Sequence, residues 1–286
     1  MRIVDTSSSS TTSDQPSSAA IKATRGVLMA IGGAEDKMDD KVILSAFSNL
    51  AGGKKARIAI VPTASSIETA GLRYKAIFLG MGVESAEVVY IQNREDASSE
   101  DNLRELDRAT GIFLTGGNQL KLSAMIGGTR FEECVRRRHQ QGVVIAGTSA
   151  GASILSAHMV AGGAGGAVPK QRMAQMVAGF GLISDLIIDQ HFRQRNRIGR
   201  LLTLVATNPG LLGIGIDEDT AAVFDADGTT MEVIGRHSVT IVDGSQMYSD
   251  IYRVKGHGEV TVSDARLHVL PAGRKFDLGT RALIPD

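Results

Sequence analysis

The stretch from residue 143 to residue 153, V-V-I-A-G-T-S-A-G-A-S, constrains the fold of this chain more than any other. Its apolar start predicts a buried strand. The small residues that follow, and then Ile154 and Leu155 at helical spacing, predict a helix. Ser149 lies at the apex of the tight turn between them. We expect glycine to be required at positions 147 and 151, because a side chain at either position would clash with the neighbouring strand or helix.

A turn of this shape prepares Ser149 to attack a carbonyl carbon. It exposes the hydroxyl beyond the end of the sheet, and it directs the free N–H groups and the positive dipole of the helix N-terminus at the same point. The pattern G-x-S-x-G is short, so an ordinary glycine-rich turn is the alternative. The strand before it and the helix after it are the context that a catalytic serine of this kind requires. We therefore favour Ser149 as a nucleophile.

Strands and helices alternate from the start of the fold to about residue 160. This alternation predicts a parallel sheet that is covered on both faces, with ligands bound at the carboxyl ends of its strands. The expected strands are Val27–Ile31, Arg57–Val61, Glu87–Ile91, Gly111–Thr115 and the strand before Ser149. The expected helices are Asp39–Leu50, Ile67–Met81, Glu100–Ala109, a segment from Leu120, and Thr129–Gln141.

Two glycine pairs follow strands at that edge of the sheet. Gly116 and Gly117 would let backbone N–H groups face a ligand, and the N–H groups of Gly117 and Ala150 are candidate oxyanion donors. A plain turn explains this pair equally well. Gly32 and Gly33 match neither G-x-G-x-x-G nor a P-loop, so we expect a tight turn there rather than a nucleotide site.

The second half of the site is expected at the ends of two later strands. Among the six histidines, only His191 lies at the end of an apolar strand between polar residues, which makes it the best candidate for a general base. The buried strand Leu211–Ile216 ends in three acidic residues, one of which could orient His191 as the third member of a triad does. Spacing alone leaves four candidates open, Asp189, Asp217, Glu218 and Asp219.

Four arginines, at positions 193, 195, 197 and 200, follow His191. An arginine run is most often a solvated face. Here it lies at an expected helix start, where acidic residues are favoured instead. We infer that the arginines face something negative, such as a carboxylate of the substrate, which arginine clamps bidentately. A helix that began at once would place Arg193, Arg197 and Arg200 on one face.

Composition excludes several classes of protein. The chain has 286 residues with 31 basic and 31 acidic side chains, so a formal net charge of +0 does not suggest a nucleic-acid partner or an anionic membrane. Cys134 is the one cysteine, which excludes an intramolecular disulfide and a thiolate metal cluster. No metal-ligand spacing, cofactor motif, membrane-length apolar run or secretory signal is present, so we expect a cytoplasmic protein without cofactor or metal.

The chain divides into a tail and one α/β domain. Residues 1–24 are rich in Ser and Thr and are expected to be disordered, because they cannot bury enough apolar surface. Residues 25–286 are expected to form a single domain. Its last part, residues 230–286, is a series of short alternating strands that predict an antiparallel extension without catalytic residues. The expected strands there are Met231–Ile234, Val239–Val242, Tyr252–Val254, Val260–Val262 and Leu267–Leu270.

Five motifs in this order resemble those of the cyanophycinases, in the serine peptidase family that also contains the aspartyl dipeptidases. The resemblance covers the chain from about residue 26 to its end, and the Ser-rich tail lies outside it. Asn118 departs from the Asp that related sequences often have. The motifs are G-G-A-E-D-K at residues 32–37, T-G-G-N-Q at 115–119, G-T-S-A-G-A at 147–152, D-Q-H-F at 189–192 with the arginines at 195, 197 and 200, and G-I-D-E at 215–218.

The resemblance implies an activity, a fold and a set of site residues. It implies a flavodoxin-like sheet similar to that of class I glutamine amidotransferases, a homodimer, and a triad of Ser149, His191 and Glu218. The family pattern specifies no residue at the position of Arg193. The helix should therefore start later than it would if Arg193, Arg197 and Arg200 shared one helical face. The residues implied to line the substrate pocket are Gln119, Asp189, Gln190, Arg195, Arg197 and Arg200.

The implied substrate is cyanophycin, a poly-aspartate chain with arginine on each β-carboxyl, and the implied product is the β-aspartyl-arginine dipeptide. Asp189 could then meet the substrate guanidinium. Two alternatives stay open. A related aspartyl dipeptidase would share the triad and act on small Asp-X peptides, and a binding protein would use the serine turn only as a turn.

Overall fold

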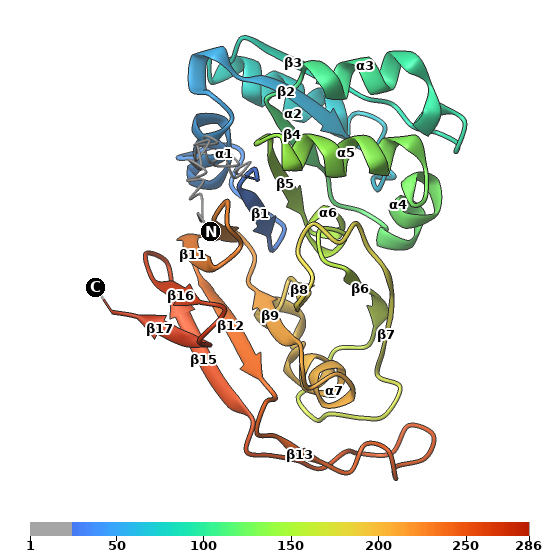
Figure 1. The fold of residues 1–286 in the computed structure, drawn as a ribbon, viewed down its shortest axis with the longest axis vertical. Coiled ribbons are helices and arrows are strands. Elements are labelled where there is room, and N and C mark those ends of the chain that lie inside the picture. The colour runs from blue at the N-terminus through green and yellow to red at the C-terminus, as the bar shows by residue number, and fades with distance from the viewer. Residues whose placement is uncertain (1–24, 286) are drawn as a thin grey trace, which may run out of the picture.

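The computed structural model describes residues 25–285, and the tail expected at residues 1–24 lies outside the described residues. A nine-stranded sheet and a four-stranded sheet carry most of the fold (Figure 1). The order of the larger sheet is β17 (Ala282–Ile284), β16 (Lys275–Asp277), β11 (Thr230–Gly235), β10 (Thr220–Phe224), β1 (Leu28–Ile31), β5 (Val144–Thr148), β4 (Gly111–Leu114), β2 (Arg57–Val61) and β3 (Ser85–Val88).

The first five strands of the chain form the parallel core of this sheet. β1 pairs in parallel with β5, β5 with β4, β4 with β2, and β2 with β3. β10 then pairs antiparallel with β1, and β11, β16 and β17 continue antiparallel from it. The predicted α/β class with a large central sheet is therefore confirmed. The third strand begins at Ser85 and ends at Val88, earlier than the predicted Glu87–Ile91.

Helices cover both faces of the parallel core because alternate residues of each strand point to opposite sides. Met29 and Ile31 of β1 belong to one apolar cluster and Leu28 and Ala30 to another. The first cluster lies under α1 (Val42–Leu50) and α2 (Ala70–Gly80). The second lies under α3 (Glu100–Arg108), α4 (Gln119–Ile126) and α5 (Arg130–Gln140). Figure 1 shows these five helices around the upper part of the molecule.

The strands that carry the expected base and acid do not join the larger sheet. β8 (Leu186–Gln190) and β9 (Leu212–Ile216) are parallel neighbours in the four-stranded sheet, which β12 (Ser238–Asp243) and β15 (Arg266–Pro271) extend antiparallel. α7 (Ile198–Thr207) packs against this sheet, and its buried Leu201 and Val205 share an apolar cluster with Ile187 of β8. The expected nucleophile therefore follows a strand of the larger sheet, whereas the expected base and acid follow strands of the smaller one.

The remaining elements are short. α6 (Ala150–Ser153) ends before Ile154, so the helix after Ser149 is shorter than predicted. β6 (His158–Gly163) and β7 (Ala174–Ala178) form a hairpin, and β13 (Tyr248–Ser249) pairs with β14 (Val262–Ser263). Residues 252–254, predicted to be a strand, contain a turn instead. Within residues 25–285, no helix has the length and apolar character needed to cross a membrane.

Candidate active site

The turn at Ser149 has the strained backbone expected of an exposed nucleophile. Ser149 adopts φ 53° and ψ −111° between the end of β5 and the start of α6, a conformation that non-glycine residues rarely adopt. A Cβ at Gly147 would lie 2.0 Å from the carbonyl oxygen of Gly151, and a Cβ at Gly151 would lie 2.3 Å from that of Leu114. The prediction that both glycines are sterically required is therefore confirmed.

Ser149, His191 and Glu218 lie in one hydrogen-bonded row. The Oγ of Ser149 is 2.9 Å from Nε2 of His191, and Nδ1 of His191 is 2.7 Å from Oε1 of Glu218. His191 follows the end of β8, Glu218 follows the end of β9, and these strands are parallel neighbours. The arrangement has the geometry of a nucleophile, a general base and an orienting carboxylate.

The protonation state of His191 suits a general base. Burial lowers the pKa of His191 below its usual value, and the hydrogen bond that His191 donates to Glu218 opposes this shift. The imidazole is therefore neutral near pH 7. Its Nδ1–H donates to Glu218, which leaves the lone pair of Nε2 free to accept the proton of Ser149.

The other three acidic candidates are engaged elsewhere. Asp217 accepts hydrogen bonds from the backbone N–H of Arg193 and from Ser238. Asp219 accepts the backbone N–H of Asp36 at 2.8 Å. Asp189 is fully buried and pairs with two arginines. Of the four carboxylates that spacing left open, the structure places Glu218 against the imidazole.

The candidate oxyanion donors lie at the ends of neighbouring parallel strands. Gly117 follows β4, and Ala150 follows β5 as the first residue of α6. In the described part of the chain, the N–H groups of Gly117 and Ala150 do not donate to another protein group. Gly117 has φ 144°, and a Cβ there would lie 2.0 Å from the carbonyl oxygen of Ala64. Only glycine fits this close approach.

Ser149 and His191 line a pocket of about 450 Å³. Four of the expected substrate residues, Gln119, Gln190, Arg195 and Arg197, also line it. Gln119 donates from Nε2 to the carbonyl oxygen of Val160 at 3.1 Å, which fixes its amide. Gln190 is buried, and its Oε1 accepts a hydrogen bond of 2.8 Å from Arg197. Burial lowers the pKa of Arg197 to about 10, which still leaves it charged at neutral pH.

Asp189 and Arg200 do not line the pocket, contrary to expectation. Arg200 is 1% exposed and holds Asp189 with Nε at 2.9 Å and with Nη2, in a bidentate pair. The negative group that Arg200 faces is thus a carboxylate of the same chain. Because Asp189 is 0% exposed and already paired, it is not placed to meet a substrate guanidinium.

The arginine run is divided between two local structures. Residues 193–195 form a 3₁₀ turn, and α7 begins only at Ile198. Arg193 therefore shares no helical face with the later arginines. Its side chain is 63% exposed and lies near Asp217. The later helix start that the resemblance implied is confirmed, and the argument from a single helical face is wrong.

The sequence reasoning did not assign four other residues of the pocket. Glu35, Lys37, Arg73 and Tyr74 also line it. Oε2 of Glu35 accepts the Thr148 hydroxyl at 2.6 Å, and Oε1 accepts the Tyr74 hydroxyl. Burial raises the pKa of Tyr74, so the phenol stays protonated as a donor. The motif G-G-A-E-D-K could have predicted two of these residues. Glu35 and Lys37 follow β1 at the edge of the sheet where ligands bind.

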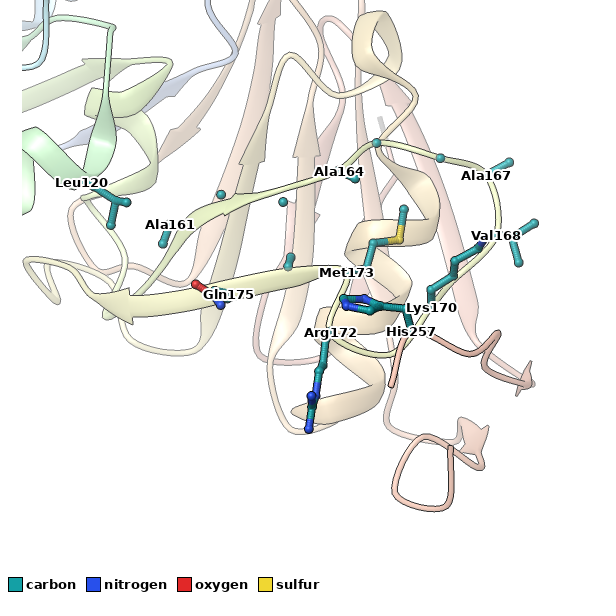
Figure 2. A pocket seen from close by; sticks show the side chains of 15 residues that line it. Leu120, Ala161, Ala164, Ala167, Val168, Lys170, Arg172, Met173, Gln175 and His257 are labelled. Carbon is teal, nitrogen blue, oxygen red and sulfur yellow. The ribbon is translucent and has the colours of Figure 1, made fainter. Parts of the chain in front are cut away.

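A larger hollow of about 670 Å³ lies along the β6–β7 hairpin (Figure 2). Residues 161–168 form one wall, and Lys170, Arg172 and His257 are among the other lining residues. Figure 2 shows Arg172 directed away from the wall. No residue of the Ser149 row lines this hollow. The wall is nevertheless linked to the site, because Arg200 donates from Nη1 to the carbonyl oxygen of Gly163 at 2.9 Å.

The described residues contain no group of three or more His, Cys, Asp or Glu side chains arranged to hold a metal ion. The chemistry of the site is that of a serine, an imidazole and a carboxylate, with two free N–H groups nearby and cations in the pocket. Such a site can transfer an acyl group from a substrate that carries carboxylates to water.

This chain is similar to a known family of peptidases and to several cyanophycinases. The profile of the family described as Peptidase family S51 matches residues 27–232. A cyanophycinase of Trichormus variabilis is 43% identical over 267 residues, which cover 92% of this chain and 89% of that protein. The cyanophycinase of Geminocystis herdmanii is 42% identical over 259 residues, covering 90% of this chain and 95% of that protein.

Two solved structures share the fold. The crystal structure of a peptidase from an acI-B1 Actinobacterium superposes with a TM-score of 0.66 at 22% identity, over 90% of this chain and 98% of that one. That of a putative peptidase E protein from Listeria monocytogenes superposes with a TM-score of 0.51 at 16% identity, over 73% of this chain and 97% of that one. At these identities the likeness concerns the fold alone.

Proposed function

The chain belongs to peptidase family S51, and from this premise we propose that it is a serine peptidase that hydrolyses cyanophycin to β-aspartyl-arginine dipeptides. The observation that carries the proposal is the row of Ser149, His191 and Glu218, with contacts of 2.9 and 2.7 Å, at the edge of a cationic pocket. The identity of 40–43% to several cyanophycinases supports the choice of substrate.

The reaction is acyl transfer in two steps. His191 takes the proton of Ser149 through Nε2 as the hydroxyl attacks a backbone carbonyl of the poly-aspartate chain. The N–H groups of Gly117 and Ala150 bind the oxygen as it becomes negative. His191 then protonates the leaving amine, and a water molecule activated by His191 hydrolyses the acyl-enzyme. Glu218 holds the imidazole in the required tautomer and stabilises its charged form.

The charge of the pocket supports a substrate that carries carboxylates. Each repeat of cyanophycin carries the free carboxylate of its arginine, and the described lining includes the cations Lys37, Arg73, Arg195 and Arg197. Gln119 and Gln190 add amide groups at the pocket wall. In this proposal Arg195 and Arg197 contact substrate, while Asp189 and Arg200 act beneath the pocket by positioning Arg197 and the strand end before His191.

Other parts of the proposal rest on the resemblance to cyanophycinases. We propose a homodimer in the cytoplasm, a flavodoxin-like parallel core, and residues 230–286 as its antiparallel extension. Sedimentation equilibrium tests the dimer, since a chain of 30.2 kDa should then sediment with about twice that mass. Sedimentation at the mass of one chain at micromolar concentration would contradict it.

The function is tested with insoluble cyanophycin and mass analysis of the soluble products. The parent protein should release β-aspartyl-arginine, and Ser149→Ala should lower kcat by roughly 10⁵ to 10⁶ because the nucleophile is lost. Ser153→Ala is a matched control. It makes the same change four residues later in the same turn, at a buried hydroxyl that has no hydrogen-bond partner within the described residues. Ser153→Ala should retain activity.

A loss below about tenfold in Ser149→Ala would contradict the assignment of the nucleophile. If the parent protein does not clear the polymer but hydrolyses small Asp-X peptides, the aspartyl dipeptidase alternative replaces the proposal. If neither substrate is consumed and Ser149 fails to react with a serine-directed reagent, the binding-protein alternative is favoured.

A further inference from the structure

Lys37 is a cation of the pocket that the proposed mechanism does not use. Its ammonium is 3.0 Å from Oε1 of Glu35 and 3.0 Å from the carbonyl oxygen of the same residue. It also lies 5.3 Å from the centroid of the Tyr74 ring. The Lys37 side chain is 16% exposed and that of Glu35 is 1% exposed. The ammonium is thus fixed in position and largely withdrawn from water, yet it lines the catalytic pocket.

The cluster around Lys37 is connected directly to the nucleophile. Glu35 accepts the hydroxyls of Tyr74 and Thr148, and Thr148 is the residue before Ser149. Each oxygen of this carboxylate already accepts a hydrogen bond from a neutral hydroxyl, so Glu35 has hydrogen-bond partners without the lysine. A buried ion pair contributes little net stability, because desolvation of both charges offsets their attraction. The pair therefore needs an explanation other than stability.

The contacts of Lys37 leave a donor for a ligand. An ammonium has three N–H groups, and within the described residues Lys37 donates one hydrogen bond, to the carbonyl oxygen of Glu35, and forms an ion pair with Oε1 of the same residue. The remaining N–H belongs to a side chain that lines the pocket. Glu35 and the Tyr74 ring restrict the lysine stem, so little side-chain entropy is left to lose when a ligand binds.

The other cations of the pocket are held differently. Arg197 shares its Nη1 between Gln190 and Asp189, and Arg73 and Arg195 are exposed. Exposed cations attract anions weakly because water screens them. Lys37 combines low exposure, a fixed position and a free donor. Among the described residues of the pocket, Glu35 carries the one carboxylate, and it is 1% exposed and already contacts Tyr74, Thr148 and Lys37.

We propose that Lys37 binds a carboxylate of the substrate beside Ser149 and so determines which bond of the polymer is presented to the nucleophile. The inference rests on the proposed function. Two carboxylates of cyanophycin have the required chemistry. One is the α-carboxylate at the end of the poly-aspartate chain, and the other is the α-carboxylate of an arginine side group. Binding of the chain end would restrict cleavage to the terminus, whereas binding of an arginine carboxylate would set the register along the repeat.

The test compares Lys37→Met with the parent protein on three synthetic oligomers of β-aspartyl-arginine. The first has all its carboxylates free, the second is amidated at the terminal aspartate, and the third carries argininamide in place of arginine. Lys41→Met is the matched control, because Lys41 is a nearby lysine that donates to Met38 and Asp39 backbone oxygens and does not line the pocket. Lys37→Gln is a second, less apolar variant.

The expected result is a rise in KM of roughly 10- to 100-fold for Lys37→Met on the first oligomer, since a hydrogen bond to a charged group is lost, with a much smaller change in kcat. This penalty should disappear on the oligomer that lacks the carboxylate held by Lys37. The ratio of kcat/KM between oligomers is measured in one preparation of each variant, so a loss of folded protein cancels. Lys41→Met should give the parent ratios.

The outcomes separate the inference from the proposed function. A penalty that vanishes with the terminal amide assigns Lys37 to the chain end, and one that vanishes with argininamide assigns it to the side group. Equal penalties on all three oligomers, while the parent protein cleaves them, would overturn the inference and leave the function intact. If the parent protein cleaves none of the oligomers and does not clear the polymer, both the proposed function and this inference are contradicted.

Discussion

The two sheets of this protein contribute to the site in different ways. The nine-stranded sheet supplies Ser149 and the two candidate oxyanion donors from the adjacent parallel strands β5 and β4. The four-stranded sheet supplies His191 and Glu218 from the adjacent strands β8 and β9. Each half is built from parallel neighbours whose carboxyl ends meet. The geometry of each half is therefore local, but the contact between Ser149 and His191 depends on how one sheet is docked against the other.

The docking occurs at the end of β1. The N–H of His191 donates to the carbonyl oxygen of Gly32 at 2.8 Å, and the N–H of Asp219 donates to that of Gly33 at 2.9 Å. The N–H of Gly32 donates to the carbonyl oxygen of Thr220 at 2.9 Å, which holds the same turn to β10 within the nine-stranded sheet. The Gly32-Gly33 pair thus joins the sheet of the nucleophile to the sheet of the base. This accounts for the pair without a bound phosphate.

The largest expected effect after loss of Ser149 itself comes from the acid of the smaller sheet. Glu218→Gln should lower kcat by about 10⁴, because an amide in place of the carboxylate favours the wrong tautomer of His191 and does not stabilise its charged form. Asp219→Asn is the neighbouring control, since Asp219 bonds the backbone of Asp36 rather than the imidazole. Steady-state kinetics on the polymer measure both. An equal loss in Asp219→Asn would show that the chosen carboxylate is wrong.

A smaller effect is expected where the two sheets meet. A Cβ at Gly33 would lie 2.3 Å from Cε1 of His191, so Gly33→Ala should displace the imidazole. A displacement of about 1 Å from productive geometry costs about 10²-fold in rate. We expect a loss of that size in kcat, with the fold retained, as measured by kinetics alongside circular dichroism.

Gly82→Ala separates the displacement of His191 from the strain of the backbone. Gly82 has φ 82°, close to the φ 98° of Gly33, and an added Cβ there would meet no atom within 4 Å. Both alanine variants should lose similar amounts of unfolding free energy through the positive φ, but only Gly33→Ala should lose activity. If both variants keep parental kcat, the position of His191 does not depend on this contact.

The same division explains how much the sequence predicts. The strand, turn and helix at Ser149 are contiguous, and the two steric glycines lie within two residues of the serine, so local chemistry predicts the turn. His191 is predicted as the one histidine at a strand end between polar residues. The choice of Glu218 over its neighbours was not available from spacing, because it depends on which carboxylate the docked sheets bring to Nδ1, and only the family resemblance supplied it.

Charge was the least predictable property of the site. Cations in the sequence suggested a substrate carboxylate, but Arg200 faces Asp189, eleven residues earlier in the same chain. An ion pair between β8 and α7 forms only when the helix packs, and periodicity gives no sign of it. Lys37 was left unassigned for the converse reason. Its neighbours in sequence are charged and look solvated, whereas its contact with the ring of Tyr74, from a distant helix, could not be read from the sequence.

The smallest expected effect concerns the charge that the arginine segment imposes on His191. The pKa of His191 is lowered first by burial and further by the positive charge of Arg195, so the acid limb of kcat/KM should lie below the usual histidine value of 6.5. The base must be neutral to act, and activity is therefore lost as the pH falls through this lowered pKa.

Arg195→Gln removes a repelling cation, so the pKa of His191 should rise and the acid limb should move to higher pH. Arg193→Gln is the matched control, because Arg193 is exposed and lies near Asp217 instead. A pH profile of Arg195→Gln that coincides with that of Arg193→Gln would show that solvent screens Arg195 from the imidazole, and the lowered pKa would then come from the burial of His191 between the two sheets and from Arg197.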